Sequence, residues 1–499
     1  MTDWPEVLVA IDVGTSGARA AAFDLDGRRR LEVRRSYPTT APRPGWAEQS
    51  ATDWRSAAVG ALAGLVRALG PRRRVLAIGL TGQCPSVVLV DARGRPVRPG
   101  LIYRDNRAVA EAAALRERYG DAAIHRRTGH LPAAFHVGPK LLWLRANEPA
   151  AWAAARLALQ PRDWVGLALT GEAATDGTHA AATLLYDLRG GRWDGGLLAD
   201  LELPGSLVPR IARPDEVIGT LRPPVATRVG LPPGTPVVCG AADSQACALG
   251  AGVVDPGPVS EMAGSSTCLN AAVRTPLDVL EVTHYPHVIA GRYTTETGIN
   301  TSGSAVAWVA DGWYGGRRGR AGAGDYARLD AEAAAVPAGA EGVLALPVLA
   351  DGERTDPALR GAFAGLSLRH GRAVVARAML EGVAFAIRDQ LDLLRQGGLP
   401  VDELRVSGGD ARLGSWNRIK ADALGIPVRT IAGDAAVAGV AMLAGLGAGV
   451  YRDPAEAIGR CVRPEPAIEP DPTRRPGYDA AFDRWRRLLA SPAVHVRTA

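Results

Sequence analysis

The chain has 499 residues, which exceeds what one hydrophobic core usually holds, so two or more domains are expected. Hydrophobic residues make up 47% and charged residues 22%, which is typical of a soluble globular protein and excludes a disordered one. The net charge of +6 comes almost wholly from arginine, since Lys140 and Lys420 are the only lysines. A charge this small over this length argues against a nucleic-acid partner.

Cysteine usage and terminal composition limit the cellular setting. The five cysteines are scattered and form no Cys-x-x-Cys pair, so neither a disulfide framework nor a zinc site is predicted. The first residues, Met-Thr-Asp-Trp-Pro-Glu, lack the basic and apolar regions of a secretion signal. The longest uncharged run, residues 435–450, is short and glycine-rich, and we interpret it as a buried helix. We therefore expect a cytoplasmic protein with no membrane partner.

The first half of the chain alternates strand and helix patterns. Apolar runs predict strands at residues 7–11, 18–23, 31–37, 75–80 and 87–90, and helical spacing predicts a helix over 53–69. Residues 105–230 are alanine-rich and helical in character, as an insertion would be. The stretch "PPGTPVVCGAADSQACALGAGVV" then predicts a second buried strand, which ends on Asp243 and leads into a helix of small residues.

Near Pro256 the same pattern starts again. Residues 257–273 predict a strand, a small-residue turn and a strand, and residues 403–428 predict a strand, a Gly-Gly turn, a helix and a strand. The chain is therefore interpreted as a duplicated α/β unit, with domains at 1–252 and 253–455. The remaining residues, 456–499, are expected to form a proline-rich connector and a last helix at about 476–490.

The opening stretch "VLVAIDVGTSGARAAAFD" places an acid, Asp12, directly before a turn of glycines and hydroxyls. Gly14 lets a ligand approach the backbone closely, and the amides and hydroxyls of Thr15 and Ser16 suit phosphate oxygens. An acid beside a phosphate repels it unless a cation lies between them, and Mg²⁺ prefers such a set of oxygens. Asp12 is thus interpreted as a magnesium ligand, often through water. The alternative is an aspartate that only caps the hairpin turn.

A second small-residue turn, at residues 264–267, offers a matching set of donors in the second half. Gly408 and Gly409, between a predicted strand and helix, would let a flat adenine approach the backbone. Two such turns, one in each half, favour a nucleotide that lies between the halves. The chain has no Gly-x-x-x-x-Gly-Lys-Ser/Thr, no strand that runs into Gly-x-Gly-x-x-Gly and no His-Arg-Asp, which excludes P-loop, dinucleotide and protein-kinase machinery.

Ordered motifs along most of the chain resemble those of the FGGY family of carbohydrate kinases. They include "AIDVGTSG", "GWAEQ", "GLTGQ", "RPGLIYRDNR", "VVCGAADSQACALGAG", "EMAGSSTCLN", "DGERTDPALRGAFAGL" and "VSGGDARLGSWNRIKAD". Within the family, the xylulokinases are the most similar. The resemblance implies two duplicated RNase H-like domains of the actin/hexokinase type, with ATP and Mg²⁺ as cofactors.

The resemblance also implies a role for individual residues. Asp243 matches the catalytic base, although an aspartate there could also cap the helix that follows. Asp12 and Asp243 would lie beside the metal. Residues implied in nucleotide binding are Asp12, Gly14, Thr15, Ser16 and Arg19 from the first half, Gly264, Ser265, Ser266 and Gly303 from the second, and Gly408, Gly409 and Asn417 around the adenosine.

The sugar pocket departs from the xylulokinase pattern. Its implied residues are Gln83, Cys84, Pro85, Arg104, Asp105 and Asp243. Cys84-Pro85 stands where xylulokinases carry Met-His, Tyr103-Arg104 replaces Trp-Asn, and Ser244 replaces the Asn after the base. Loss of one polar partner can change discrimination between analogues by about 10⁴-fold. Arg104 would favour an acidic substrate, or it points to solvent. Lys140 also matches a family signature, and either a surface position or a structural role is favoured over catalysis.

The expected activity is ATP-dependent phosphorylation of a sugar hydroxyl, with D-xylulose as the leading substrate. A different ketose, a polyol or an aldonate is the alternative within the same chemistry. A non-enzymatic nucleotide sensor of the same fold is the alternative from another class, although a sensor needs no base. The expected partners are the sugar and ATP, and a homodimer is the assembly considered.

Overall fold

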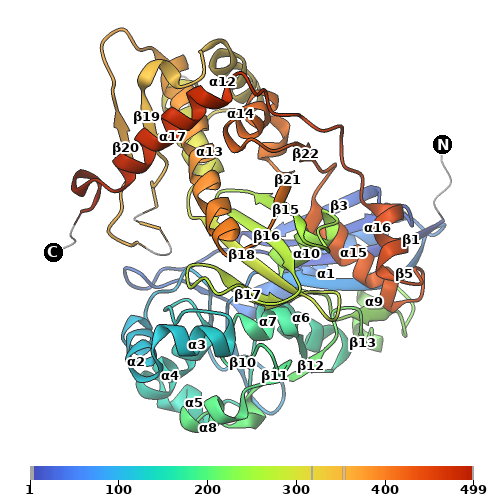
Figure 1. Ribbon diagram of the computed structural model, residues 1–499. Helices are drawn as coiled ribbons and strands as arrows, with labels where there is room; N and C mark the ends of the chain where they lie inside the picture. The colour runs from blue at the N-terminus through green and yellow to red at the C-terminus, as the bar shows by residue number, and fades with distance from the viewer. Residues whose placement is uncertain (1–4, 316–318, 351, 354–355, 497–499) are drawn as a thin grey trace.

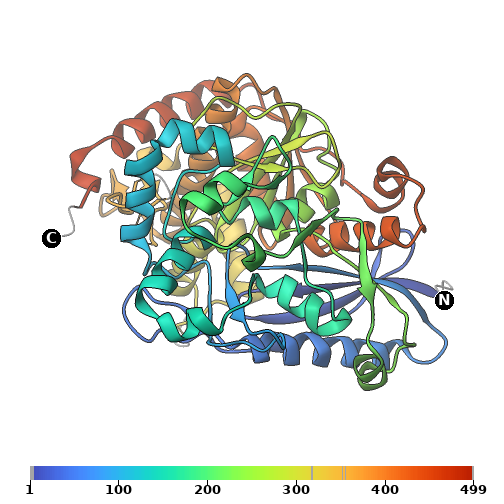
Figure 2. The same cartoon turned by 90° about the horizontal axis from the view of Figure 1, so that it is seen from below.

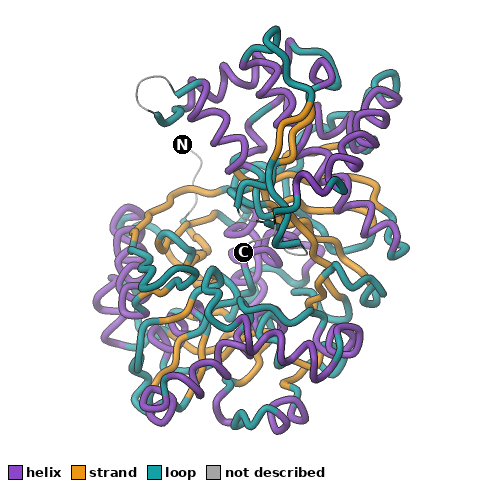
Figure 3. Tube along the Cα trace, turned by 90° about the vertical axis from the view of Figure 1, so that its left-hand side faces the viewer, coloured by secondary structure: helices purple, strands orange, loops and turns teal. Residues whose placement is uncertain are grey.

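The computed structural model describes residues 5–315, 319–350, 352–353 and 356–496. Asp351, Arg354 and Thr355 of the "DGERTDPALRGAFAGL" motif lie outside these residues. In Figure 1 most of the first half, coloured blue to green, lies below most of the second half, coloured yellow to red. The side view in Figure 3 shows helices on the outside of both parts and strands between them.

The first sheet is built around the opening hairpin and has the order β13-β14-β5-β1-β2-β3. β1, β2 and β3 are antiparallel neighbours, whereas β5 and β14 run parallel to β1. Its strands are β1 (Glu6–Val13), β2 (Gly17–Phe23), β3 (Arg29–Ser36), β5 (Arg74–Gly82), β13 (Val217–Thr220) and β14 (Pro236–Val238). The strands predicted over 7–37 and at 75–80 are confirmed. The prediction that a strand ends on Asp243 is wrong, because β14 ends at Val238 and four residues separate it from Asp243.

The second sheet repeats this arrangement, with the order β17-β18-β16-β15-β21-β22. Its strands are β15 (Gly257–Ala263), β16 (Thr267–Val273), β17 (Thr283–Pro286), β18 (Tyr293–Ile299), β21 (Val401–Gly408) and β22 (Val428–Thr430). When the edge strands β13 and β17 are left out, each sheet has five strands. Numbered along the chain, these five strands lie in the order third, second, first, fourth and fifth in both sheets, and the fourth and fifth are parallel to the first. The predicted duplicated α/β fold is therefore confirmed.

Helix α1 (Ala51–Leu69) covers one face of the first sheet, as the view from below shows (Figure 2). Ser50 caps its start by accepting the Asp53 amide at 3.3 Å, and its apolar side, which includes Trp54, is fully buried. The opposite face is covered by α15 (Ala435–Gly447), which comes from the second half and is buried as predicted. A helix from one half therefore completes the core of the other.

Helices α15 and α10 (Asp243–Gly250) cross backbone to backbone. A Cβ atom added to Gly439 would lie 2.0 Å from the Ala246 carbonyl oxygen, and one added to Gly250 would lie 1.9 Å from that of Ala435. Only glycine allows this approach. The crossing fixes the helix that begins at Asp243 against the helix that follows β22.

Residues 105–230 form mostly helices, as predicted: α2 (Val109–Tyr119), α3 (Asp121–Thr128), α4 (Val137–Asn147), α5 (Pro149–Ala154), α6 (Pro161–Thr170), α7 (Gly177–Ala181), α8 (Gly195–Asp200) and α9 (Pro223–Val229). Short strand pairs accompany them: β4 (Glu48–Gln49) with β7 (Gly100–Leu101), β6 (Val88–Val90) with β8 (Leu157–Leu159), β9 (Ala174–Asp176) with β12 (Arg210–Ala212), and β10 (Tyr186–Asp187) with β11 (Arg192–Trp193).

The second half adds α11 (Gly303–Trp313), α12 (Ala323–Ala335), α13 (Arg372–Gln396), α14 (Gly414–Leu424) and the pair β19 (Leu344–Leu346) and β20 (Ala362–Ala364). The chain continues through α16 (Pro454–Cys461) to α17 (Arg475–Leu489), where the last helix was predicted. In the described part of the chain, no helix has the length and apolar character needed to cross a membrane.

Candidate active site

The predicted acids of the first half lie at one edge of its sheet. β1, β5 and β14 are parallel, so their carboxyl ends meet at the same edge, which is where open α/β sheets bind ligands. Asp12 lies at the end of β1, Gln83 follows β5, and Asp243 follows β14 as the first residue of α10. The charge of Asp12 is one of the causes that raise the pKa of Asp243.

The environment of Asp243 favours a carboxyl group that holds its proton more strongly than usual. Burial is the main cause, the charges of Asp12 and Glu296 add to it, and the pKa of Asp243 reaches about 7. The Ser244 amide partly opposes this by donating to Asp243 Oδ1 at 2.8 Å. A carboxylate with a pKa near working pH is suited to accept a proton from a hydroxyl.

Asp12 is paired with arginine and not left alone beside the turn. Arg19 Nε donates to Asp12 Oδ2 at 2.8 Å, and Arg19 Nη1 donates to Asp434 Oδ2 at 2.5 Å. Burial nevertheless raises the pKa of Asp12, and the charge of Asp434 adds to the rise. Asp434 caps the start of α15, so this row of three charges joins the two halves of the molecule.

The first turn is held by side chains that contact its carbonyl groups. Tyr37 donates its hydroxyl to the Gly14 carbonyl at 2.5 Å, and Gln49 Nε2 donates to the Thr15 carbonyl at 2.7 Å. Within the described chain, no protein group accepts the amides of Thr15 and Ser16. These amides remain available to an anion, and phosphate binding at this turn stays a prediction.

The second turn has a similar arrangement at the start of α11. The Gly303 amide donates to the Gly264 carbonyl at 3.1 Å, and the Ser304 amide donates to the Ser265 carbonyl at 3.1 Å. Gly264, Ser265 and Ser266 are exposed. The structure therefore brings together all four residues predicted for phosphate binding in this half, although the Gly303 amide is used within the turn.

The residues predicted around the adenosine follow β21. Gly408 has φ +105°, and a Cβ atom there would lie 2.1 Å from the Ala263 carbonyl oxygen. Gly409 is exposed and has open space at its Cβ position. Asn417 is buried, and its Nδ2 donates to the Ala411 carbonyl at 3.1 Å. Asn417 thus holds the backbone that follows Gly409.

On the sugar side, Gln83 and Cys84 follow β5 directly. Gln83 is buried, and its Nε2 donates to Gln49 Oε1 at 2.8 Å and to the Gly14 carbonyl at 3.3 Å, which links this segment to the first turn. Cys84 and Pro85 are half-buried. Burial raises the pKa of the Cys84 thiol, and the charge of Asp243 adds to the rise.

Arg104 is exposed and contacts its own neighbour. Its Nε donates to the Tyr103 hydroxyl at 3.1 Å, and Thr15 Oγ1 lies 3.4 Å from the same hydroxyl. The side chain is therefore exposed to solvent but connected through Tyr103 to Thr15 of the first turn.

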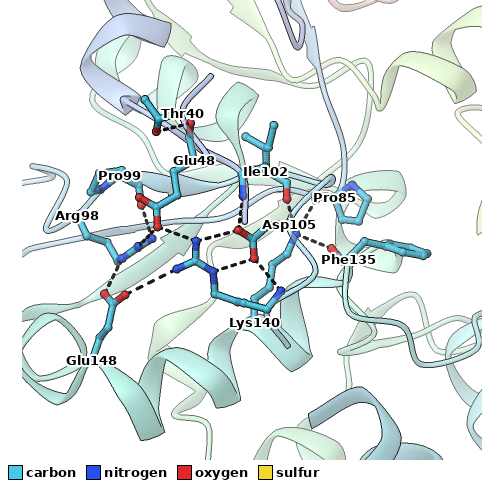
Figure 4. Close-up of polar contacts among 12 residues, drawn as sticks. Thr40, Glu48, Pro85, Arg98, Pro99, Ile102, Asp105, Phe135, Lys140 and Glu148 are labelled. Carbon is cyan, nitrogen blue, oxygen red and sulfur yellow. Dashed lines mark hydrogen bonds and ion pairs between the residues drawn. The ribbon is translucent and has the colours of Figure 1, made fainter. Parts of the chain in front are cut away.

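Asp105 is fully buried and engaged by the protein (Figure 4). Its oxygens accept the Ala47 amide at 2.6 Å and Arg107 Nε and Nη2, both at 2.8 Å. Arg107 also donates to Glu48 Oε1 at 2.7 Å. In this structure Asp105 anchors the loop that carries Tyr103, and protein groups occupy both of its oxygens.

Lys140 is not a surface lysine, because its side chain is fully buried. Its Nζ donates to the carbonyls of Ile102 at 2.7 Å, Phe135 at 2.8 Å and Pro85 at 3.5 Å (Figure 4). Burial lowers the pKa of Lys140 to about 7. This geometry agrees with the structural role, since one ammonium ties together the backbones beside Cys84 and Tyr103.

Sequence reasoning missed three features of this site. Asp434 carried a signal as the N-cap of a predicted helix, but nothing placed it beside Arg19. Glu296 of β18 accepts the Ser244 hydroxyl at 2.7 Å, across the two halves. A buried group around Asp176 lies behind the base, and "ATDGTHAA" looked like an interruption between helices.

The donor set fits a magnesium–nucleotide complex. Asp12 and Asp434 both accept hydrogen bonds from Arg19, and Asp243 lies at the same edge of the sheet. Burial raises the pKa values of Asp12 and Asp243, and a cation beside them would oppose that rise. The described residues contain no cluster of three side chains able to hold a metal without other ligands. Mg²⁺ suits this arrangement, because it typically takes one or two carboxylates together with phosphate oxygens and waters.

Comparison with known proteins identifies related sequences over nearly the whole chain. Residues 7–250 match the N-terminal domain, and residues 260–448 the C-terminal domain, of the FGGY family of carbohydrate kinases. A xylulose kinase from Escherichia coli is 30% identical over 96% of this chain and 98% of its own length. A glycerol kinase from Bordetella parapertussis is 31% identical over 97% and 96%. The crystal structure of a xylulose kinase from Rhodospirillum rubrum has a TM-score of 0.89 at 33% identity, covering 97% and 98%.

Proposed function

The chain belongs to the FGGY family of carbohydrate kinases, and we propose that it transfers the γ-phosphoryl group of ATP to D-xylulose, giving D-xylulose 5-phosphate. The observation that carries this proposal is the meeting of Asp12 and Asp243 at one sheet edge, beside a turn with unbonded amides. A sensor that only binds nucleotide does not need the second acid.

In the proposed reaction, Asp243 accepts the proton of the sugar hydroxyl as its oxygen attacks the γ-phosphorus. The raised pKa of this carboxyl suits the role, because a stronger base takes up the proton more readily. Amides and hydroxyls of the two turns would bind phosphate oxygens, and Gly408 and Gly409 would lie against the adenosine. Asp12 would lie beside magnesium, which when bound would supply positive charge to the phosphate oxygens.

Replacing the base tests the mechanism. We expect Asp243→Asn to lower kcat by about 10²- to 10⁴-fold, because the amide cannot take the proton, while ATP still binds. Asp255→Asn, which removes an exposed carboxylate, is the matched control. Sugar-dependent ADP release measures turnover and equilibrium binding measures ATP affinity. An Asp243→Asn variant with wild-type kcat would refute the assignment.

D-xylulose is favoured by the similarity to xylulose kinases, and Arg104 favours a sugar acid as the second candidate. The exposed Arg104 guanidinium, linked through Tyr103 to Thr15, places a positive charge near the expected substrate. Turnover of D-xylulose, other ketoses, polyols and aldonates should be compared by kcat/KM. If the wild-type protein prefers an aldonate and Arg104→Gln loses this preference, a sugar acid is the substrate in place of D-xylulose.

A cytoplasmic location and a homodimer stay predictions from the sequence. Cell fractionation tests the first, and light scattering on the purified protein tests the second.

A further inference from the structure

The peptide unit that joins Ala241 to Ala242 lies directly before Asp243, in the link between β14 and α10. Threonine hydroxyls hold both of its polar atoms. Thr81 Oγ1 donates to the carbonyl oxygen at 2.7 Å, and the Ala242 amide donates to Thr178 Oγ1 at 2.8 Å. Ala241 and Ala242 are 0% and 2% exposed, so water does not replace either hydroxyl.

Thr81 connects this peptide to the strand that carries Asp12. It lies on β5, directly opposite Asp12 in the register of β1 and β5, and its side chain is buried. The backbone before Asp243 is therefore bonded to the strand pair that ends beside the other acid of the site. A shift of this link would change the distance between the two acids.

Asp176 fixes the direction of the Thr178 hydroxyl. Thr178 Oγ1 donates its single proton to Asp176 Oδ2 at 2.6 Å, which leaves its lone pairs to accept the Ala242 amide. Burial alone would raise the pKa of Asp176, but the hydrogen bond from His179 and the charge of Arg162 bring it to about 2. Asp176 is thus an ionised acceptor at neutral pH.

Arg162 supplies the charge that balances Asp176 and a second contact to the same link. Its side chain is buried, and its Nη2 donates to Asp176 Oδ1 at 2.7 Å. Its Nη1 donates to the carbonyl oxygen of Cys239, the first residue after β14. The buried group around Asp176 therefore holds the link at Cys239 and at Ala242, and Thr81 holds it at Ala241.

We propose that Thr178 and Thr81 are positioning residues, which hold the peptide before Asp243 and so set the place of its carboxylate in the reaction. The inference rests on the proposed function, in which Asp243 is the base. Loss of one hydroxyl leaves a buried amide or carbonyl without its partner, and the link relaxes toward another geometry. A displacement of about 1 Å at a reacting group can cost roughly 10²-fold in rate.

The test compares Thr178→Val, which has the same shape without the hydroxyl, with Thr178→Ser, which keeps the hydroxyl. We expect Thr178→Val to lower kcat by about 10- to 100-fold, with KM for sugar and for ATP nearly unchanged, and Thr178→Ser to restore most of the rate. Thr81→Val and Thr81→Ser form a second pair with the same expectation. Equal kcat in the Val and Ser variants, with only a lower melting temperature in Val, would overturn the proposal.

Amide hydrogen exchange gives a readout that does not depend on activity. Exchange of the Ala242 amide should accelerate in Thr178→Val and return toward the wild-type rate in Thr178→Ser. Unchanged protection in Thr178→Val would contradict the assigned hydrogen bond. A wild-type protein that turns over none of the tested sugars would instead refute the proposed function, so the two failures are distinguishable.

Discussion

The central hairpins of the two sheets have the same topology but place their charges differently. One residue before the end of its first strand, the first hairpin pairs Asp12 with Arg19, whereas the second pairs Met262 with Cys268. The preceding residue of each strand points to the opposite face of its sheet. It is the buried Ile11 in the first hairpin and Glu261 in the second, where Lys420 Nζ donates to the Glu261 carboxylate at 2.7 Å.

This difference indicates that two copies of the same backbone can carry their charged side chains at different positions. The first hairpin keeps its ion pair at the sheet edge, where it can meet a ligand. The second keeps its ion pair in the interior, with both side chains 0% exposed, and presents the neutral Met262 and Cys268 beside a turn of small residues at the edge. We therefore expect the first pair to govern activity and the second to govern stability.

The largest effect is expected from breaking the interior pair. Lys420→Met should lower the free energy of unfolding by about 3–5 kcal/mol, because Glu261 would be left buried without its partner. Urea unfolding measures the loss. The double variant Glu261→Gln with Lys420→Met should recover most of it, since no buried charge remains. A single variant as stable as the wild type would show that the pair does not support the second sheet.

The next effect is expected at the end of β21, where the second half approaches the nucleotide in the proposed mechanism. Gly408→Ala should cost about 2–3 kcal/mol, because its φ is +105° and the new Cβ atom would meet the Ala263 carbonyl. Gly409→Ala, with open space at the same atom, is the control and should leave stability nearly unchanged. Thermal unfolding compares the two, and an equal loss in both would contradict this reading.

At the edge of the first hairpin, Asp12→Asn should lower kcat/KM for magnesium–ATP by about 10- to 100-fold, or about 1.4–2.8 kcal/mol. The charge near the metal is reduced, while the amide still fits beside Arg19. Met262→Leu changes the corresponding residue of the second hairpin and should have little effect on activity. Comparable losses in both variants would remove the contrast between the hairpins.

The smallest effect concerns the junction of the two halves, where His130 packs against His136 and Tyr285, and His284 lies on β17. Burial lowers the pKa of His130 well below its usual value, that of His136 to about 4 and that of His284 to about 3. In the unfolded chain all three have pKa values near 6.5. As the pH falls through 6.5, only the unfolded state takes up protons, so stability decreases.

Between pH 7.5 and 6.0 each buried histidine should cost about 1 kcal/mol. Melting temperatures at both pH values measure this dependence. His130→Phe keeps a ring between His136 and Tyr285, but the unfolded chain then has one histidine fewer that can take up a proton. The melting temperature of this variant should therefore depend less on pH. A steeper dependence in His130→Phe would contradict the assignment.

Local patterns were sufficient for much of the fold and for the choice of candidate site residues. Alternating and helical spacing predicted the opening hairpin, helix 53–69 and the buried run 435–450, because these periods depend on neighbours in the chain. The turns of small residues also led to the predicted phosphate-binding residues, whose role stays a prediction. The strand before Asp243 was misjudged at its end, since β14 has only three residues and gives almost no periodic signal.

What the sequence alone determined is the chemistry available: two acids, two turns of small residues, and a pattern of strands and helices that is repeated along the chain. What only the tertiary structure decided is which of these groups meet. Arg19 and Asp434 are 415 residues apart, and Lys140 resembles a surface residue until three carbonyls surround it. Such contacts depend on packing between distant segments, where burial and electrostatics act through space and leave no periodic trace in the chain.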